Sequence, residues 1–149
     1  MRVKKFISPQ PYNYKTKITI QIGDINYGGH VGNERYLLFA QETRMRFLKT
    51  LGLSELNFGL YGLILAEAGI EYLAELFQGD EITISIAIDN ITRASFDCYY
   101  SIEKNQGEKT IVAAYIKTSL IFYDYNERKV KSIPEDIRKK LTELNQTTY

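Results

Sequence analysis

The sequence contains no tryptophan, one histidine and one cysteine among its 149 residues. A single cysteine, Cys98, cannot form a disulfide within the chain, which favours a reducing compartment, so we expect a cytoplasmic protein. Neither sign of charge is in excess, because 19 Lys and Arg residues stand against 18 Asp and Glu residues. This balance gives no support to a nucleic-acid partner. Long apolar runs are also missing, including behind the N-terminal MRVKKFISPQPYNYK, so we expect neither a signal peptide nor a membrane partner.

The apolar content, 44% of the residues, is enough for one ordinary hydrophobic core, and no repeat or linker divides the chain. We therefore expect a single domain over residues 1–149. Between Tyr14 and Ile22 apolar and polar residues alternate, which predicts a half-buried strand. From Glu34 to Leu51 the chain has no Gly or Pro and its apolar residues recur at helical spacing, which predicts one long helix that ends before Gly52.

Strand-like segments dominate the chain after this helix. Short turns separate four of them and favour antiparallel pairing; the segments are Leu63–Leu76, Glu81–Ile91, Ser95–Glu103 and Lys109–Tyr125. Pro134 predicts a short final helix, Glu135–Leu144. This order predicts an α+β fold in which a curved antiparallel sheet wraps one long central helix. Some strands are apolar on both faces, as in residues 84–88, which leaves a second face for a subunit.

A glycine-rich stretch, GDINYGGHVGN, joins the first strand to the long helix. It spans residues 23–33 and holds four of the ten glycines and the only histidine. Glycines let the backbone approach a ligand closely, and a helix N-terminus offers unpaired N–H groups and the positive end of the helix dipole. These features favour an oxyanion-binding turn, although they also suit a strand-to-helix turn without a ligand. In the first case we expect the backbone N–H groups of Gly29, His30 and Val31 to lack partners within the chain.

This stretch is followed by the helical QETRMRFLKTLG and by IEYLAELFQGDEITI, ITRASFDCYYSI and LIFYDYNERKVKSIP. From Lys17 to about Leu141 the sequence resembles the hotdog-fold acyl-CoA thioesterases of the 4-hydroxybenzoyl-CoA thioesterase type, whose members carry a motif like G-D-x-D-x-x-G-H-V-N-N before a long helix. The resemblance implies hydrolysis of an acyl-CoA or acyl-carrier-protein thioester, with no cofactor and no metal. It also implies a homodimer or homotetramer in which two sheets join edge to edge and the thioester sites lie between subunits.

One position departs from the motif of that family. The second acid of D-x-D, usually the general base or nucleophile, is Asn26 here, and an amide can serve as neither. Asp24 could replace it by acting on a water that Asn26 also holds, and His30 belongs to a residue type that exchanges protons near neutral pH. Asn33 could orient the water. Glu67, in the apolar context LAEAG, could supply a carboxylate from a strand beside the helix.

Other residues are candidates for contact with the substrate rather than for catalysis. Tyr27, Gly29, Val31 and Gly32 belong to the glycine-rich stretch, where the resemblance places the thioester. Arg93 lies in a predicted turn and could meet a phosphate of coenzyme A.

Two other functions remain open at this point. Hydratase-type hotdog enzymes carry a motif like G-D-x-N-P-x-H, in which Asp and His handle the addition of water to an enoyl thioester. Here the proline is missing and His30 comes one residue late. The other alternative is an acyl-thioester binding protein without turnover, because Asn26 removes the acid from an otherwise intact loop.

Overall fold

The computed structural model describes residues 6–145, so the first five residues of the N-terminal segment considered above lie outside it. Its strands form one antiparallel sheet in the order β1–β3–β4–β5–β2, with β6 paired to the end of β5. The elements in chain order are β1 (Tyr14–Thr19), the 3₁₀ turn η1 (Ile22–Asp24), α1 (Arg35–Thr50), β2 (Gly62–Tyr72), β3 (Glu81–Asp89), β4 (Ser95–Gln106), β5 (Lys109–Asp124), β6 (Lys129–Val130) and α2 (Glu135–Leu144).

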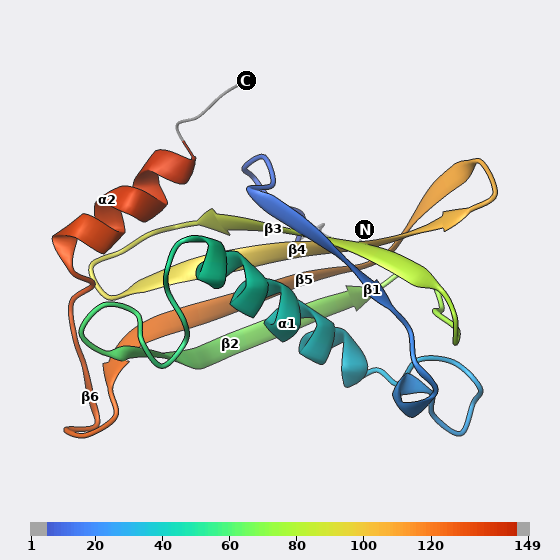
Figure 1. The fold of residues 1–149 in the computed structure, drawn as a ribbon, viewed down its shortest axis with the longest axis horizontal. Helices are drawn as coiled ribbons and strands as arrows, with labels where there is room; N and C mark the ends of the chain where they lie inside the picture. Colours follow the sequence, from blue (N-terminus) through green and yellow to red (C-terminus); the bar gives the residue numbers. More distant parts are fainter. Residues whose placement is uncertain (1–5, 146–149) are drawn as a thin grey trace.

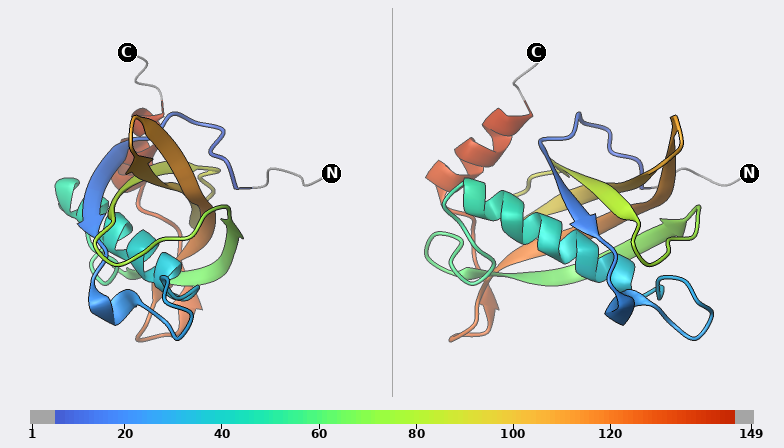
Figure 2. Two further views of the ribbon diagram at one scale, coloured as in Figure 1. Left: turned by 90° about the vertical axis from the view of Figure 1, so that its right-hand side faces the viewer. Right: turned by 45° about the vertical axis from the view of Figure 1, so that its right-hand side comes forward.

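The long helix α1 lies against the curved sheet, and α2 lies at one end of the molecule (Figures 1 and 2). Alternate residues of the central strands point toward α1, as the period of two along each strand requires. On β3 these are Ile82, Ile84, Ile86 and Ile88, and their partners on β4 are Lys104, Ile102, Tyr100 and Cys98. The helix buries residues at helical spacing against them, including Phe39, Ala40, Thr43, Phe47 and Leu48. The expected α+β hotdog fold is therefore confirmed.

Two predicted strands end three or four residues earlier than their sequence patterns indicated, and β3 and β5 end one or two residues earlier, at Asp89 and Asp124. The first ends at Thr19 rather than Ile22, because residues 22–24 form a 3₁₀ turn. β2 ends at Tyr72 rather than Leu76, because the N–H groups of Leu73 and Ala74 both donate to the carbonyl of Ala113 and the ladder stops there. The chain then turns inward and buries Leu76 completely. Residues 73–76 are consequently a loop, and this loop forms one wall of the candidate site.

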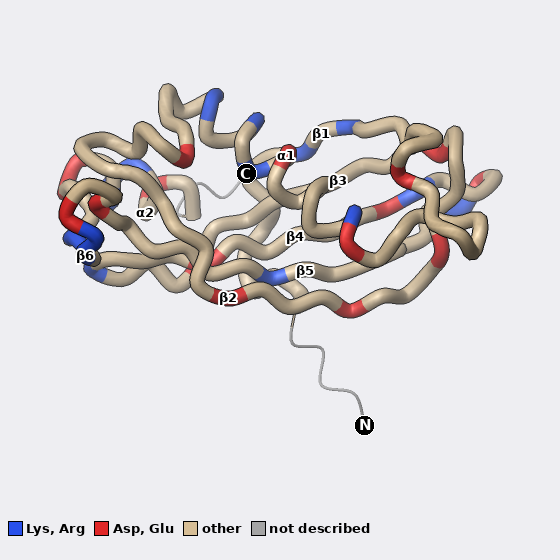
Figure 3. The backbone as a smooth tube through the Cα atoms, turned by 90° about the horizontal axis from the view of Figure 1, so that it is seen from below, with Lys and Arg blue, Asp and Glu red and all other residues tan. Residues whose placement is uncertain are grey.

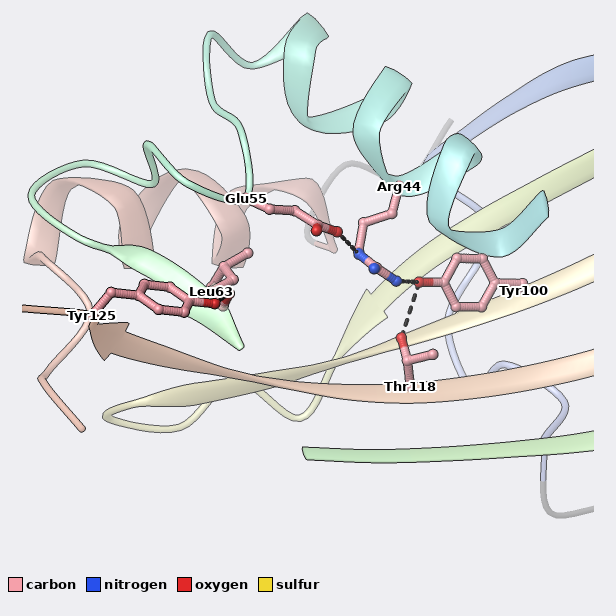
Figure 4. Close-up of polar contacts among 6 residues, drawn as sticks. All are labelled: Arg44, Glu55, Leu63, Tyr100, Thr118 and Tyr125. Carbon is pink, nitrogen blue, oxygen red and sulfur yellow. Dashed lines mark hydrogen bonds and ion pairs between the residues drawn. The ribbon is translucent and has the colours of Figure 1, made fainter. Parts of the chain in front are cut away.

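A buried polar cluster fixes α1 to the sheet and to the loop that follows the helix (Figure 4). The guanidinium of Arg44 donates from Nε to Glu55 Oε1 at 2.5 Å and from Nη1 to the hydroxyl of Tyr100 at 2.8 Å. The Tyr100 hydroxyl also lies 2.9 Å from Oγ1 of Thr118 on β5. Arg44 and Tyr100 are both buried, so these contacts compensate for the loss of water around the charge.

Strand β2 is an edge of the sheet and is largely exposed along its middle. Leu65 on β2 and Leu38 and Met45 on α1 are about half exposed. The two charged residues of β2 are acidic, whereas basic residues gather near β6 and α2 (Figure 3).

On the outer face of the sheet, the ring of Phe6 packs against Gly69 on β2. The N-terminal segment of the chain itself therefore covers part of the face that the sequence pattern left for a subunit.

Candidate functional site

The pocket at the N-terminal end of α1 has a volume of about 360 Å³, which is enough for part of a small-molecule ligand. The glycine-rich turn supplies one side, the first turn of α1 supplies another, and the end of β2 with its following loop supplies the third. Its lining residues are Asn26, His30, Val31, Asn33, Tyr36, Tyr72, Leu73, Ala74 and Glu75. Three of the five predicted catalytic residues are thereby brought together: Asn26, His30 and Asn33.

Asn26 closes the glycine-rich turn with both its backbone and its side chain. Its N–H donates to the carbonyl of His30 at 2.9 Å, and its carbonyl accepts from the N–H of Gly29 at 3.1 Å. Gly29 adopts φ = +82°, a conformation that favours glycine. The side-chain Oδ1 of Asn26 accepts from the N–H of Gly28 at 2.9 Å. The Nδ2 amide group of Asn26 has no partner among residues 6–145, so it is a free donor at the pocket.

The imidazole of His30 packs back into the same turn. Its Nδ1 lies 3.1 Å from the carbonyl oxygen of Val31, and because a carbonyl can only accept, this contact requires the proton on Nδ1. The opposite nitrogen, Nε2, faces Gly28, where an added Cβ would stand 3.1 Å from it. His30 therefore holds the shape of the turn, and it is also one of the residues that line the pocket.

The expectation that three backbone N–H groups of the turn are free is wrong for two of them. The N–H of Gly29 donates to Asn26, and the N–H of Val31 donates to the carbonyl of Leu76 at 2.8 Å. In the described part of the chain, the N–H groups of His30 and Asn33 have no hydrogen-bond partner. These two donors, just ahead of α1, are available to a developing negative charge.

Asp24 lies in a different polar network and does not line the pocket. Its carboxylate accepts from the N–H of Gln21 at 2.9 Å and lies 3.8 Å from Nε of Arg35. Arg35 also donates to the carbonyl of Gly23 at 3.0 Å. Asp24 thus ties the 3₁₀ turn η1 to the first residue of α1, which is a supporting contact rather than a contact with the pocket.

Glu67 lies away from the pocket in the described chain. It pairs in register with Ser119 on the face of the sheet opposite α1, and it lines a second hollow of about 160 Å³ with Phe6 and Lys117.

The hydratase alternative requires Asp24 and His30 to act together, and only His30 reaches the pocket.

Of the residues predicted to contact the substrate, some lie at the pocket and others lie away from it. Val31 lines the pocket, Gly32 is buried beside it, and Tyr27 and Gly29 are exposed on the rim of the turn. Arg93 lies near the C-terminal helix, where its Nη1 donates to Oγ of Ser132 at 2.5 Å. Figure 1 places that turn, between β3 and β4, at the opposite end of the sheet from the glycine-rich turn.

Two tyrosines from distant parts of the chain form the back of the pocket. The rings of Tyr36 and Tyr72 meet edge to face at 5.0 Å, and their hydroxyls donate to the carbonyls of Ala74 and Asn33, respectively. Burial raises the pKa of Tyr36, and the charges of Tyr72 and Glu75 add to this effect. Burial also raises the pKa of Tyr72, with a further contribution from the charge of Glu34. Both phenols therefore stay protonated and neutral at neutral pH.

Glu75 is a pocket residue that sequence analysis missed. The strand pattern continued to Leu76, and nothing in it marked Glu75, which is exposed in the structure, as a residue that lines a pocket. The only available signal was its place shortly before the expected turn at residues 78–80.

A family model described as the thioesterase-like superfamily matches residues 20–141. Solved structures with the same fold include a 1,4-dihydroxy-2-naphthoyl-CoA thioesterase from Synechocystis, 23% identical with a TM-score of 0.77 over 88% of this chain and 96% of that one. A mutant 4-hydroxybenzoyl-CoA thioesterase complexed with 4-hydroxybenzoyl-CoA is 19% identical, with a TM-score of 0.77 over 89% and 97%. A Thermus thermophilus thioesterase complexed with coenzyme A and zinc is 20% identical, with a TM-score of 0.78 over 93% and 98%. Because these sequence identities are low, the similarity to the solved structures shows a shared fold only.

Within residues 6–145, no three or more His, Cys, Asp or Glu side chains are grouped so that they could hold a metal ion. The helices in this range are also too short or too polar to cross a membrane.

Proposed function

The chain belongs to the thioesterase-like superfamily, and from this premise we propose that it hydrolyses an acyl-CoA thioester to the free acid and coenzyme A. The observation that carries the proposal is the pocket at the start of α1, where free donors meet an apolar wall. The N–H groups of His30 and Asn33 and the amide of Asn26 supply the donors, and Val31 and Leu73 are part of the wall.

The chemistry follows from what these donors can stabilise. When water attacks a thioester, the carbonyl oxygen becomes negatively charged, and fixed N–H donors at a helix N-terminus stabilise that charge in place of water. Asn26 cannot accept a proton or act as a nucleophile, so the residue at the usual acid position cannot form a covalent acyl-enzyme, and we expect direct attack of water on the thioester. Asp24 supports the turn from outside the pocket.

The exposed edge strand supports a homodimer. A second copy paired to β2 around a two-fold axis would cover the exposed part of Leu65. Antiparallel pairing would bring the start of the second β2 beside the end of the first, where the pocket lies. Ile121 pairs with both Ile64 and Ser95, so the turn that holds Arg93 lies at the start of β2. Arg93 of the second subunit would then approach the pocket, which supports its assignment to a coenzyme A phosphate.

The test is a hydrolysis screen with acyl-CoA thioesters of aromatic, short-chain and long-chain acids, read by detection of free thiol. We expect steady thiol release from at least one ester, in proportion to protein concentration.

Asn26 favours a second candidate function, an acyl-thioester binding protein, because it replaces the usual acid. Saturable binding of acyl-CoA by calorimetry with no thiol release from any ester would establish that alternative and overturn the hydrolase.

Oligomeric state is tested separately, by light scattering at micromolar concentration. We expect the mass of a dimer or a tetramer of 149-residue chains. A folded monomer would contradict the shared site.

A further inference from the structure

Glu75 is the one residue lining the pocket that carries a carboxylate. Its neighbours there supply hydrogen-bond donors or apolar surface, and the usual acid position is occupied by Asn26. A hydrolase that uses water needs an acceptor for the proton of that water, and a carboxylate is one of the groups that serves this purpose.

The backbone around Glu75 is fixed on both sides. The N–H of Ala74 donates to the carbonyl of Ala113 at 3.1 Å, and the carbonyl of Leu76 accepts from Val31. The carbonyl of Glu75 itself accepts from Nζ of Lys104 at 2.8 Å. These contacts hold the loop against the glycine-rich turn, so the position of the Glu75 backbone relative to the pocket is set before any ligand binds.

The carboxylate of Glu75 is free, in contrast to its backbone. It makes no hydrogen bond and no ion pair with any residue in the range 6–145, although its charge contributes to the raised pKa of the neighbouring Tyr36. The other acids near the site differ in this respect. Asp24 is bound to Gln21 and faces Arg35, and Glu67 lies on the opposite face of the sheet.

We propose that Glu75 is the general base of the reaction and takes the role that Asn26 cannot perform; this rests on the hydrolase function proposed above. The carboxylate accepts a proton from a water molecule while the water oxygen forms a bond to the thioester carbon. The π electrons of the carbonyl move to its oxygen, which the N–H groups of His30 and Asn33 stabilise. The intermediate then collapses and the C–S bond breaks, with its electron pair on sulfur. The proton held by Glu75 passes to the thiolate, so the products are the acid and the thiol of coenzyme A.

The free amide of Asn26 has a place in this scheme. Its Oδ1 is occupied by Gly28, so its Nδ2 can donate to the oxygen of the attacking water and turn the water protons toward Glu75. His30 is the other group in the pocket that could accept a proton, but its Nε2 faces Gly28 in its own turn.

The test is Glu75→Gln, which keeps the shape of the side chain and removes its basicity. With an ester that the wild-type protein hydrolyses, we expect kcat to fall by about 10²- to 10⁴-fold, the usual loss for a general base, with little change in KM. Glu75→Asp keeps the carboxylate one methylene farther back, and we expect it to retain part of the activity. The matched control is Glu71→Gln. Glu71 lies on β2 beside Tyr115, faces away from α1 and makes no ion pair within residues 6–145, and the kcat of this variant should match the wild type.

Circular dichroism of each variant distinguishes loss of chemistry from loss of fold. If Glu75→Gln leaves kcat intact while the wild type hydrolyses the ester, Glu75 is not the base but the proposed hydrolase function stands. If kcat falls only in proportion to lost folded protein, the assignment is also overturned. If the wild type hydrolyses no ester in the screen, both proposals fail together.

Discussion

The two polar regions of α1 are built in opposite ways. In its middle, Arg44 lies under the helix with its guanidinium bound to Glu55 and Tyr100. At its N-terminal end, two backbone N–H groups, one side-chain amide and one carboxylate belong to residues that line a pocket, and they have no partners in the described chain. Buried polar groups cost free energy unless they are paired, so pairing in the first region serves stability. Unpaired groups at a pocket are available to a ligand, and this contrast separates residues that maintain the fold from residues that can act on a substrate.

Arg44→Met should give the largest effect. It should disrupt the paired region around Arg44 and leave the pocket at the N-terminal end of α1 intact. It leaves Glu55 and the Tyr100 hydroxyl without their shared donor, and we expect the free energy of unfolding to fall by about 3 kcal/mol, at the low end for a broken buried pair. Urea unfolding measures this change, and the turnover rate of the folded fraction should not alter. Lys17→Met is the control, because Lys17 pairs with Glu81 at the surface, and it should cost less than about 1 kcal/mol. Equal losses in the two variants would contradict the importance of the buried cluster.

Asn26→Ala should break the unpaired region. It removes the amide that orients the attacking water toward Glu75, and we expect kcat to fall by about 10²-fold, at the low end for an impaired proton transfer. Steady-state kinetics with the best ester of the screen measures this. Asn126→Ala, in the exposed turn after β5, is the control and should keep wild-type kcat. An unchanged kcat in Asn26→Ala would show that the amide only shapes the turn.

The paired region should also respond to alkaline pH. Burial raises the pKa of Cys98 to about 12, well above its value in an unfolded chain, and burial raises the pKa of Tyr100 as well. The folded state therefore holds protons that the unfolded state loses, so stability should be complete below about pH 9 and should decline as pH rises toward 12. Each such group contributes a slope of at most about 1.4 kcal/mol per pH unit. Urea unfolding between pH 8 and 11 measures the slope. We expect a smaller slope in Cys98→Ala. A wild-type stability that does not change over this pH range would contradict the prediction.

Asp24→Asn should have the smallest effect and sharpens the contrast within the glycine-rich turn. It weakens the contact with the N–H of Gln21 and the charge interaction with Arg35, and we expect a loss of about 0.5–1 kcal/mol in the free energy of unfolding, as for a lost cap. Thermal unfolding measures this, and kcat should not change. If turnover instead fell by about 10²-fold or more, Asp24 would be the base that the sequence suggested.

Much of the fold could be predicted because local patterns and tertiary packing agree. The alternation on β3 and the helical spacing on α1 each require one buried face, and the two faces meet in the core. The second helix begins after Pro134 and has the predicted bounds, Glu135–Leu144. The early end of β2 was not predictable in this way, since it depends on a carbonyl of β5 that binds two N–H groups at once.

The candidate site was predictable only for the part that is contiguous in sequence. Asn26, His30 and Asn33 belong to one short stretch, and the turn brings them together by local hydrogen bonds. Tyr72 and Glu75 come from a distant part of the chain and reach the pocket through the sheet register and the bend before Leu76. No local pattern marks such residues. The partners of Arg44 were likewise beyond the sequence, because Tyr100 reaches it across the core.

The presence of a single histidine has an experimental consequence. His30 is the only imidazole in the chain and it lies in the wall of the pocket. A proton NMR spectrum of the unlabelled protein will therefore contain one pair of imidazole carbon-bound resonances for each subunit environment. A shift of that pair during titration with coenzyme A or an acyl-CoA would report occupancy of the pocket directly, and the two imidazole nitrogen shifts would identify the tautomer that the Val31 carbonyl selects.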